Sequence, residues 1–186
     1  MIDYELLNKA LKYYAKVGFK QIEVPWRVSA EAINSTLNSN LSFKSDDKFL
    51  IGSAEQGFLE LYLRNKLTSN QLMSVSPCFR NEQEDDLHQQ EFIKLELCCI
   101  TNYEIFRIYD SVMEDVVNFI KTELNISDFE IIKTDDSNSI YSEDIIINGI
   151  EYGSYGIRQF QDMYYIYGTG IALPRASKIL KSIKEI

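Results

Sequence analysis

Residues 75–97 read VSPCFRNEQEDDLHQQEFIKLEL, and this stretch decides the fold of the chain. It begins as an apolar strand, passes into an acidic loop and returns as a second strand, which predicts a hairpin. Arg80 and Glu82 end the first strand and share one of its faces, because side chains two residues apart point the same way. His88 and Phe92 lie where the second strand begins. The hairpin therefore predicts a surface with an arginine, an acid, a histidine and an aromatic ring, a candidate cradle for a nucleotide.

The residue types in this hairpin suit a nucleotide. The guanidinium of Arg80 can grip a phosphate or a carboxylate through two parallel hydrogen bonds. His88 can donate to a terminal phosphate, and Phe92 can stack on a base, which is worth on the order of 1–3 kcal/mol per base. Taken singly, Arg80 is better explained as an ordinary charge at the end of a strand, since most such arginines are surface charges.

Two further stretches carry candidate ligand-binding residues. Residues 167–176 read YGTGIALPRA, in which two glycines allow a tight turn and a close approach to a ligand. Arg175 follows at the start of the last predicted helix, where the helix dipole favours an anion. In residues 52–56, GSAEQ, Glu55 either complements the dipole of a helix start or holds the ammonium group of a ligand. Each stretch alone is also explained as a turn leading into a helix.

The hydrophobic pattern predicts an α+β fold in which an antiparallel sheet lies with helices on one side. Helices are predicted at residues 3–17, 53–67, 103–124 and 174–183, with Asp3 and Ser53 as N-caps, and the polar stretch 29–40 can form another. A hairpin is predicted at Asn148-Gly149, because both residues tolerate a positive φ. Strands are predicted at residues 19–26, 48–51, 71–77, 92–100, 129–133, 145–150, 151–155 and 163–167.

Composition limits the class of protein. A length of 186 residues suits one domain, and a net charge of -9 argues against a protein whose main task is to grip phosphate backbones. Three cysteines and one histidine give neither a disulfide framework nor a Cys/His metal site, so we expect reduced, packed cysteines. The start of the chain is unlike a signal peptide, and no apolar run approaches the ~20 residues of a membrane helix, so we expect a cytoplasmic protein.

Read together, the stretches resemble the catalytic core of class II aminoacyl-tRNA synthetases, closest in wording to the seryl branch. Residues 16–28, KVGFKQIEVPWRV, resemble motif 1, and Phe79-Arg80-Asn81-Glu82 with His88 to Phe92 resembles motif 2. Residues 168–175, GTGIALPR, resemble motif 3. Ser53-Ala54-Glu55 resembles the Thr-x-Glu loop of the seryl branch, and Glu151, with Ser154 and Arg158 after it, resembles the segment before motif 3.

The resemblance implies roles in ATP binding for five residues. Arg80 would contact the α-phosphate and the substrate carboxylate, and Glu82 would lie near the adenine or the motif 2 loop. His88 and Arg175 would reach the γ-phosphate, and Phe92 would stack under the adenine. Arg80 and Arg175 are therefore the implied catalytic residues.

The resemblance also implies the rest of the site and the reaction. Ser53, Glu55 and Ser154 would bind the amino acid together with Arg80, and Glu151 would face a Mg²⁺ ion. An ATP-dependent ligase of this type joins the amino acid to AMP, giving an aminoacyl-adenylate and pyrophosphate, with ATP and Mg²⁺ as cofactors. The acceptor would be the tRNA acceptor end, a carrier protein or a small amine. A non-catalytic paralogue that binds an amino acid, a nucleotide or a synthetase partner is the alternative.

The resemblance extends to domain organisation and assembly. We expect residues 1–186 to form a single, truncated, stand-alone catalytic domain without a tRNA-binding arm or an anticodon-binding domain. The short acidic loop at residues 83–87 argues against tRNA as the partner. Motif 1 forms the dimer interface in relatives, so we expect a homodimer through the region around Pro25 and Trp26.

Overall fold

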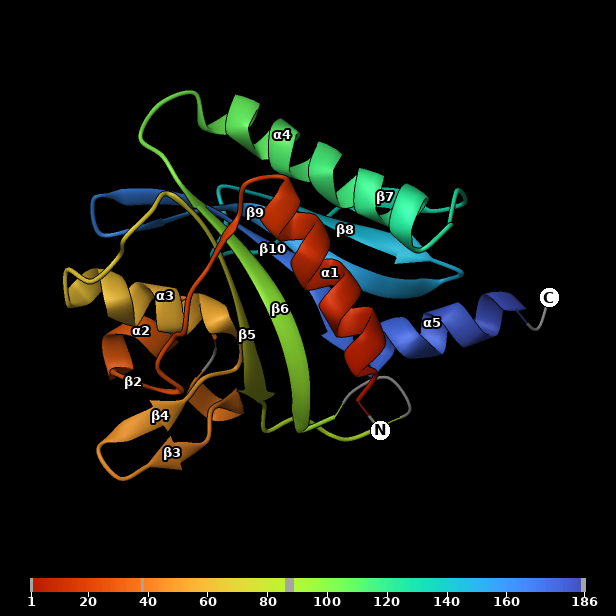
Figure 1. Cartoon of the computed structure of the whole chain (residues 1–186). Helices are drawn as coiled ribbons and strands as arrows, with labels where there is room; N and C mark the ends of the chain where they lie inside the picture. Colours follow the sequence, from red (N-terminus) through yellow and green to blue (C-terminus); the bar gives the residue numbers. More distant parts are fainter. Residues whose placement is uncertain (1, 38, 86–88, 185–186) are drawn as a thin grey trace.

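The structure is a computed structural model that describes residues 2–37, 39–85 and 89–184. Its central sheet has seven strands in the order β1-β5-β6-β10-β9-β8-β7 (Figure 1). All neighbouring pairs are antiparallel except β1 and β5, which are parallel. In this order the strands are Lys20–Gln21, Gln71–Phe79, Glu91–Ile100, Met163–Leu173, Ile150–Phe160, Tyr141–Ile147 and Glu130–Lys133.

Three long helices cover one face of this sheet (Figure 1). They are α1 (Tyr4–Lys16), α4 (Ile105–Asn118), which continues as a π-helical turn over Phe119–Glu123, and α5 (Arg175–Lys184). The opposite face is covered at one end by α2 (Ala30–Asn34) and α3 (Ala54–Leu63). A small sheet of β2 (Arg27–Val28), β4 (Lys48–Leu50) and β3 (Lys44–Ser45) and the 3₁₀ turn Ser39–Leu41 complete that side.

Helices therefore lie on both faces, and the prediction that they lie on one side is wrong. Two separate apolar cores explain the arrangement. On β6, Leu95 and Leu97 pack in the core under α1 and α4, whereas Cys98 packs in a second core with Phe58 and Leu59 of α3. Alternate residues of β6 thus face the two sides, as the period of a strand requires.

Several local predictions are confirmed. Asp3 caps α1 by accepting a hydrogen bond from the backbone of Leu6, and Ser53 and Gln56 form a capping box at the start of α3. Asn148 and Gly149 have φ values of 50° and 71° between β8 and β9, as the predicted hairpin requires. The three cysteines are free and buried. In the described part of the chain, no helix has the length and apolarity needed to cross a membrane.

Two predicted elements differ in the structure. The strand expected at residues 19–26 is reduced to β1, because Pro25 cannot donate to a ladder and the chain then turns into the small sheet. The glycine-rich stretch after Tyr167 is not a turn but the second half of β10. A Cβ at Gly170 would lie 2.2 Å from Cδ2 of Leu95, so this glycine allows two strands to approach closely around a bulge.

Candidate active site

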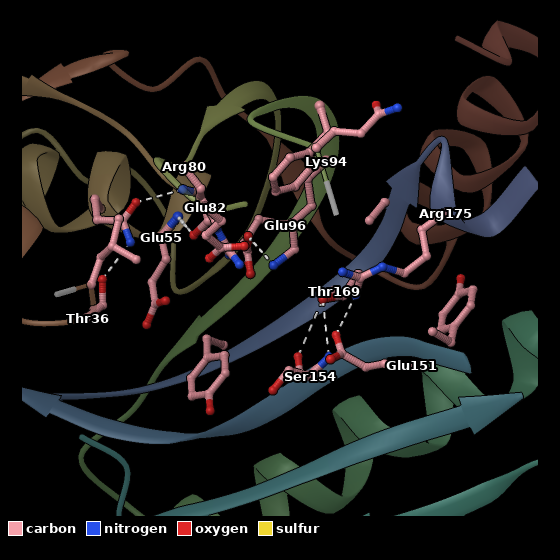
Figure 2. Close-up of a pocket in the computed structure, with 18 of the residues that line it drawn as sticks. Thr36, Glu55, Arg80, Glu82, Lys94, Glu96, Glu151, Ser154, Thr169 and Arg175 are labelled. Atoms are coloured by element: carbon pink, nitrogen blue, oxygen red, sulfur yellow. Dashed lines mark hydrogen bonds and ion pairs between the residues drawn. The ribbon is translucent and has the colours of Figure 1, made fainter. Parts of the chain in front are cut away.

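A cavity of about 340 Å³ opens on the sheet face that α3 covers only in part (Figure 2). Residues from α3, the β5–β6 hairpin, β9, β10 and the start of α5 line it, so the topology gathers stretches that are far apart in the chain. His88 lies outside the described residues. The other predicted site residues all line this one cavity: Ser53, Glu55, Arg80, Glu82, Phe92, Glu151, Ser154 and Arg175.

The β5–β6 hairpin forms one wall. Arg80 follows β5, and its backbone N–H donates to the carbonyl of Gln90 at 2.9 Å. Its side-chain Nε donates to the carbonyl of Gly52 at 3.1 Å, which ties the hairpin to the start of α3. The guanidinium lies 5.4 Å from the centre of the Phe92 ring. The arginine and the aromatic ring that the sequence predicts on one surface therefore touch.

The opposite wall holds an ion pair between two predicted site residues. Arg175, the first residue of α5, donates from Nη1 to Oε1 of Glu151 on β9 at 2.7 Å. Both side chains are only partly buried and face the cavity (Figure 2). Glu151, which the resemblance assigns to a metal ion, and Arg175, which it assigns to a phosphate, are thus neighbours in the cavity wall.

Glu55 lies deeper and is held by Arg158 of β9. Nη1 of Arg158 donates to Oε1 of Glu55 at 2.5 Å, and Nη2 donates to Oδ2 of Asp136 at 2.5 Å. The Tyr165 hydroxyl also donates to Oε1 of Glu55, at 2.9 Å, so both bonds go to the same carboxylate oxygen. The guanidinium stacks on the Tyr167 ring, 4.0 Å from its centre.

These contacts shift the titration of Asp136. Burial by itself raises the pKa of Asp136, but hydrogen bonds from Ser139 and Arg158 outweigh it and hold the pKa below its ordinary value. Arg158 therefore bridges the carboxylates of Glu55 and Asp136, and the lowered pKa keeps Asp136 ionised at neutral pH. No role for Arg158 or Asp136 could be predicted from the sequence, because these residues and Glu55 are far apart along the chain and their contact depends on the fold.

The cavity floor contains a second buried ion pair that the sequence reading missed. Lys94 and Glu96 point from β6 into the cavity, with Nζ 2.9 Å from Oε2. Glu96 is 1% exposed, and neither of its oxygens accepts a hydrogen bond of good geometry among the described residues. Burial raises the pKa of Glu96, and Lys94 opposes that shift. The sequence does contain a sign of this pair: in residues 92–97, FIKLEL, Lys94 and Glu96 alternate with apolar residues and therefore share one face of the strand.

The residues present fit a magnesium ion that phosphates help to bind. Mg²⁺ takes oxygen ligands and usually binds through one or two carboxylates together with substrate phosphates. Asp144 of β8 pairs with Ser154 of β9, on the strand that carries Glu151. Burial raises the pKa of Asp144, and the charge of Glu151 adds to that shift. No group of three or more acidic, histidine or cysteine side chains suited to a metal occurs within the described ranges. An ion here would thus depend on the ligand's phosphates.

Comparison with known proteins gives a consistent result. Residues 1–143 match the sequence family described as tRNA synthetases class II (D, K and N). Over 131 residues the chain is 28% identical to the lysine–tRNA ligase of Sulfolobus acidocaldarius; this region is 67% of the chain and 25% of that protein. The chain thus spans about a quarter of the relative's length.

Two solved structures share the fold. A pyrrolysyl tRNA synthetase of Desulfitobacterium hafniense superposes with a TM-score of 0.76 at 18% identity, over 96% of this chain and 69% of that one. A seryl-tRNA synthetase of Pyrococcus horikoshii complexed with ATP superposes with a TM-score of 0.75 at 18% identity, over 96% of this chain and 49% of that one. The predicted fold class is confirmed by this likeness.

Proposed function

The chain belongs to the class II tRNA synthetase family, as its motifs predicted, and from this premise we propose that it activates an amino acid with ATP. The family generally uses ATP and Mg²⁺. The product is an aminoacyl-adenylate, which is then passed to a tRNA acceptor end, a carrier protein or a small amine. One observation carries the proposal: three stretches far apart in the chain bring their predicted ligand-binding residues to one cavity.

The nucleotide occupies the hairpin side of the cavity in this proposal. The adenine stacks on Phe92, with Glu82 beside it, and Arg80 binds the α-phosphate. The contact of the Arg80 guanidinium with the Phe92 ring supports this assignment, because a base on Phe92 then has Arg80 next to it. Arg175 binds the γ-phosphate from the opposite wall, and the resemblance assigns His88 to the same phosphate.

The amino acid occupies the inner end. Glu55 binds its ammonium group, with Ser53 and Ser154 lining the same space and Arg80 holding the carboxylate. The arrangement around Glu55 supports this role, since Arg158 and Tyr165 both bond Oε1 and orient the carboxylate group. Arg158 acts as a positioning residue, because its guanidinium binds the carboxylates of Glu55 and Asp136 and is not assigned a contact with the substrate.

The chemistry needs little proton transfer. The substrate carboxylate is already ionised at neutral pH and attacks the α-phosphorus, while the bond to pyrophosphate breaks. The chain's own residues position the reactants and neutralise the charge that develops on the phosphate oxygens, which supplies most of the rate. When bound, Mg²⁺ would be held by Glu151 with Asp144 beside it and would neutralise phosphate charge.

The test is amino-acid-dependent exchange of pyrophosphate into ATP with each standard L-amino acid in turn. We expect exchange with at least one of them. Arg80→Ala removes a charged hydrogen-bond donor from the developing charge and should lower kcat by at least about 100-fold. Lys20→Ala, in the exposed strand β1 away from the cavity, is the matched control and should keep the wild-type rate.

A specific observation favours a second candidate, a non-catalytic paralogue that binds the same ligands. Arg175 and Glu151 pair with each other in the structure, so each occupies the partner that would otherwise be available to a phosphate or a metal ion. Measurable ATP binding without exchange for any amino acid would reject the enzyme and support this binding role. Loss of both would reject the site itself.

We also propose a second copy of the chain as a partner. The Trp26 side chain is 56% exposed beside Pro25, and the two line an open groove with Val24 and Val75. A large apolar ring exposed at this level suits an interface between copies.

A further inference from the structure

Lys94 and Glu96 have no part in the proposed ATP and amino-acid contacts, although they form the floor of the same cavity. Lys94 is 9% exposed and Glu96 is 1% exposed. Across the sheet Lys94 is level with Ser76 of β5 on one side and with Ala172 of β10 on the other, and it lines the cavity together with Ala172. Figure 2 shows its ammonium next to Glu96, between the Arg80 and Arg175 sides.

Stability does not explain a buried pair of this kind. Desolvation of two charges is expensive, and replacing a buried ion pair by apolar residues is often neutral or stabilising. A lysine ammonium has three donors, and the ion pair with Glu96 can occupy only one of them. The remaining donors are on a side chain that lines the cavity, where substrate oxygens would meet them.

The position of Lys94 along β6 points to the reacting atoms. Phe92, Lys94 and Glu96 share one face of the strand, each about 7 Å from the next. Under the proposed function, Phe92 holds the adenine. Glu96 marks the amino-acid end, because it is level with Thr169 of β10, whose hydroxyl accepts a hydrogen bond from the backbone N–H of Ser154. Lys94 therefore lies between the nucleotide and the amino acid, where the carboxylate meets the α-phosphate.

We propose that Lys94 is a further catalytic residue, whose ammonium donates to the substrate carboxylate and to an α-phosphate oxygen, and that Glu96 is the residue that positions it. The inference rests on the proposed function. In the step it serves, a carboxylate oxygen forms a bond to the α-phosphorus, and the bond from phosphorus to the bridging oxygen breaks. The electron pair leaves with pyrophosphate, and no proton is transferred.

The test compares wild type with the double variant Lys94→Met/Glu96→Met. A single Lys94→Met change would leave Glu96 as an unpaired buried charge and is strongly destabilising, whereas the double variant removes both charges and keeps the volume. The assay is exchange of labelled pyrophosphate into ATP with an equimolar mixture of the standard L-amino acids. Thermal unfolding and equilibrium binding of ATP are measured on the same samples.

We expect the double variant to fold as wild type does and to bind ATP, but to lose at least about 100-fold in kcat. Lys94→Arg, which keeps the cation, should recover at least part of the rate. Glu96→Gln should lower kcat by about tenfold, because a neutral acceptor holds the ammonium less firmly, and should leave the KM for ATP unchanged.

The possible outcomes distinguish a failure of the proposed role of Lys94 from a failure of the proposed function. A folded double variant that exchanges at the wild-type rate would overturn the role of Lys94 and leave the proposed function intact. A wild-type protein that binds ATP but supports no exchange would overturn the proposed function, and the inference would fall with it. Equal losses in Lys94→Arg and in the double variant would also overturn it, because a charge-based role requires a difference.

Discussion

At the scale of single residues, Arg158 shows how the inner end of the cavity is built. One guanidinium bonds Glu55 of α3, Asp136 of the β7–β8 connection and the face of Tyr167 on β10. Its planar fork suits two carboxylates at once, which a lysine cannot reproduce. The side chain therefore fixes the position of Glu55, the residue proposed to hold the substrate ammonium.

Arg158→Met should destabilise the protein strongly. The change leaves two carboxylates without their partner, and breaking a buried ion pair in this way costs about 3–5 kcal/mol. At this chain length we expect the Tm to fall by roughly 6–20 °C in thermal unfolding followed by circular dichroism. Arg107→Met, which breaks the exposed pair with Glu104, is the matched control and should shift the Tm little. Equal shifts in the two variants would reject the bridging role.

Single residues also mark what the sequence could and could not predict. The sequence was enough to predict that four residues share one site, because the motifs they belong to or adjoin occur in the order seen in the family. These residues are Arg80, Phe92, Glu151 and Arg175. Lys94 and Asp136 did not, because their partners are set by burial and by strand register. Neither quantity is visible in a single strand's pattern, since a buried lysine and a surface lysine have the same letter.

At the scale of elements, β10 is the largest departure from the sequence reading. A Gly-Thr-Gly stretch before a helix predicts a turn, yet the strand continues to Leu173. The glycines are needed for packing: Cβ atoms at Gly168 and Gly170 would meet Tyr155 and Leu95 at 2.7 Å and 2.2 Å. Contacts between strands far apart in the chain therefore override the local preference of glycine for turns.

Gly170→Ala should accordingly behave as an overpacking substitution. The added methyl group would meet the Leu95 side chain and lie 3.2 Å from its carbonyl oxygen, which should cost about 1–3 kcal/mol. Urea unfolding measures the loss. Gly149→Asn is the control, because its hairpin position has a positive φ that asparagine tolerates and open space around it. A Gly170→Ala protein as stable as this control would contradict the close approach.

Helices α2 and α3 are joined by one carboxylate whose ionisation should make stability depend on pH. Glu60 of α3 accepts from the Ser29 N–H at 2.9 Å and the Ser29 hydroxyl at 2.7 Å, and it pairs with Arg64. Burial by itself raises the pKa of Glu60, but these bonds hold it below its ordinary value. A lowered pKa means that the stabilisation is present above the unfolded-state pKa, about 4.3, and is lost as pH falls through the lower folded value.

Glu60→Gln should therefore be less stable than wild type at pH 7, by about 1–3 kcal/mol. The difference should shrink as the pH falls from the unfolded-state pKa of about 4.3 through the lower folded value, because the unfolded carboxyl group is protonated first and the folded one after it. Urea unfolding at a series of pH values measures it. A difference that stays constant from pH 7 to pH 3 would show that the charge of Glu60 is not what joins the two helices.

At the scale of the whole molecule, the site and the proposed interface between copies lie at different places on the central sheet. The site lies in the middle, over β6, β10 and β9, while the motif 1 stretch lies at the β1 edge with Trp26 exposed. The order of predicted helices and strands along the sequence was enough to predict an α+β fold. The placing of α2 and α3 on the second face was not, because helix patterns show which side of a helix is apolar but not which face of a sheet it covers.

Trp26→Glu tests the proposed assembly. A charge in an apolar interface between copies should convert a dimer to a monomer in sedimentation velocity at micromolar concentration. Tyr103→Glu is the matched control, since Tyr103 is 83% exposed just before α4 and takes no part in the groove. A wild-type protein that sediments as a monomer would reject the interface.

Transfer of an oxygen isotope from the amino acid to AMP tests whether this cavity activates an amino acid. The protein is incubated with ATP, Mg²⁺, hydroxylamine as acceptor and a mixture of L-amino acids whose carboxylates carry ¹⁸O, and the AMP formed is analysed by mass spectrometry. If a substrate carboxylate attacks the α-phosphorus in this cavity, the AMP carries one ¹⁸O atom, and Arg80→Ala abolishes its formation. AMP without ¹⁸O, or no AMP while ATP is bound, would contradict amino-acid activation.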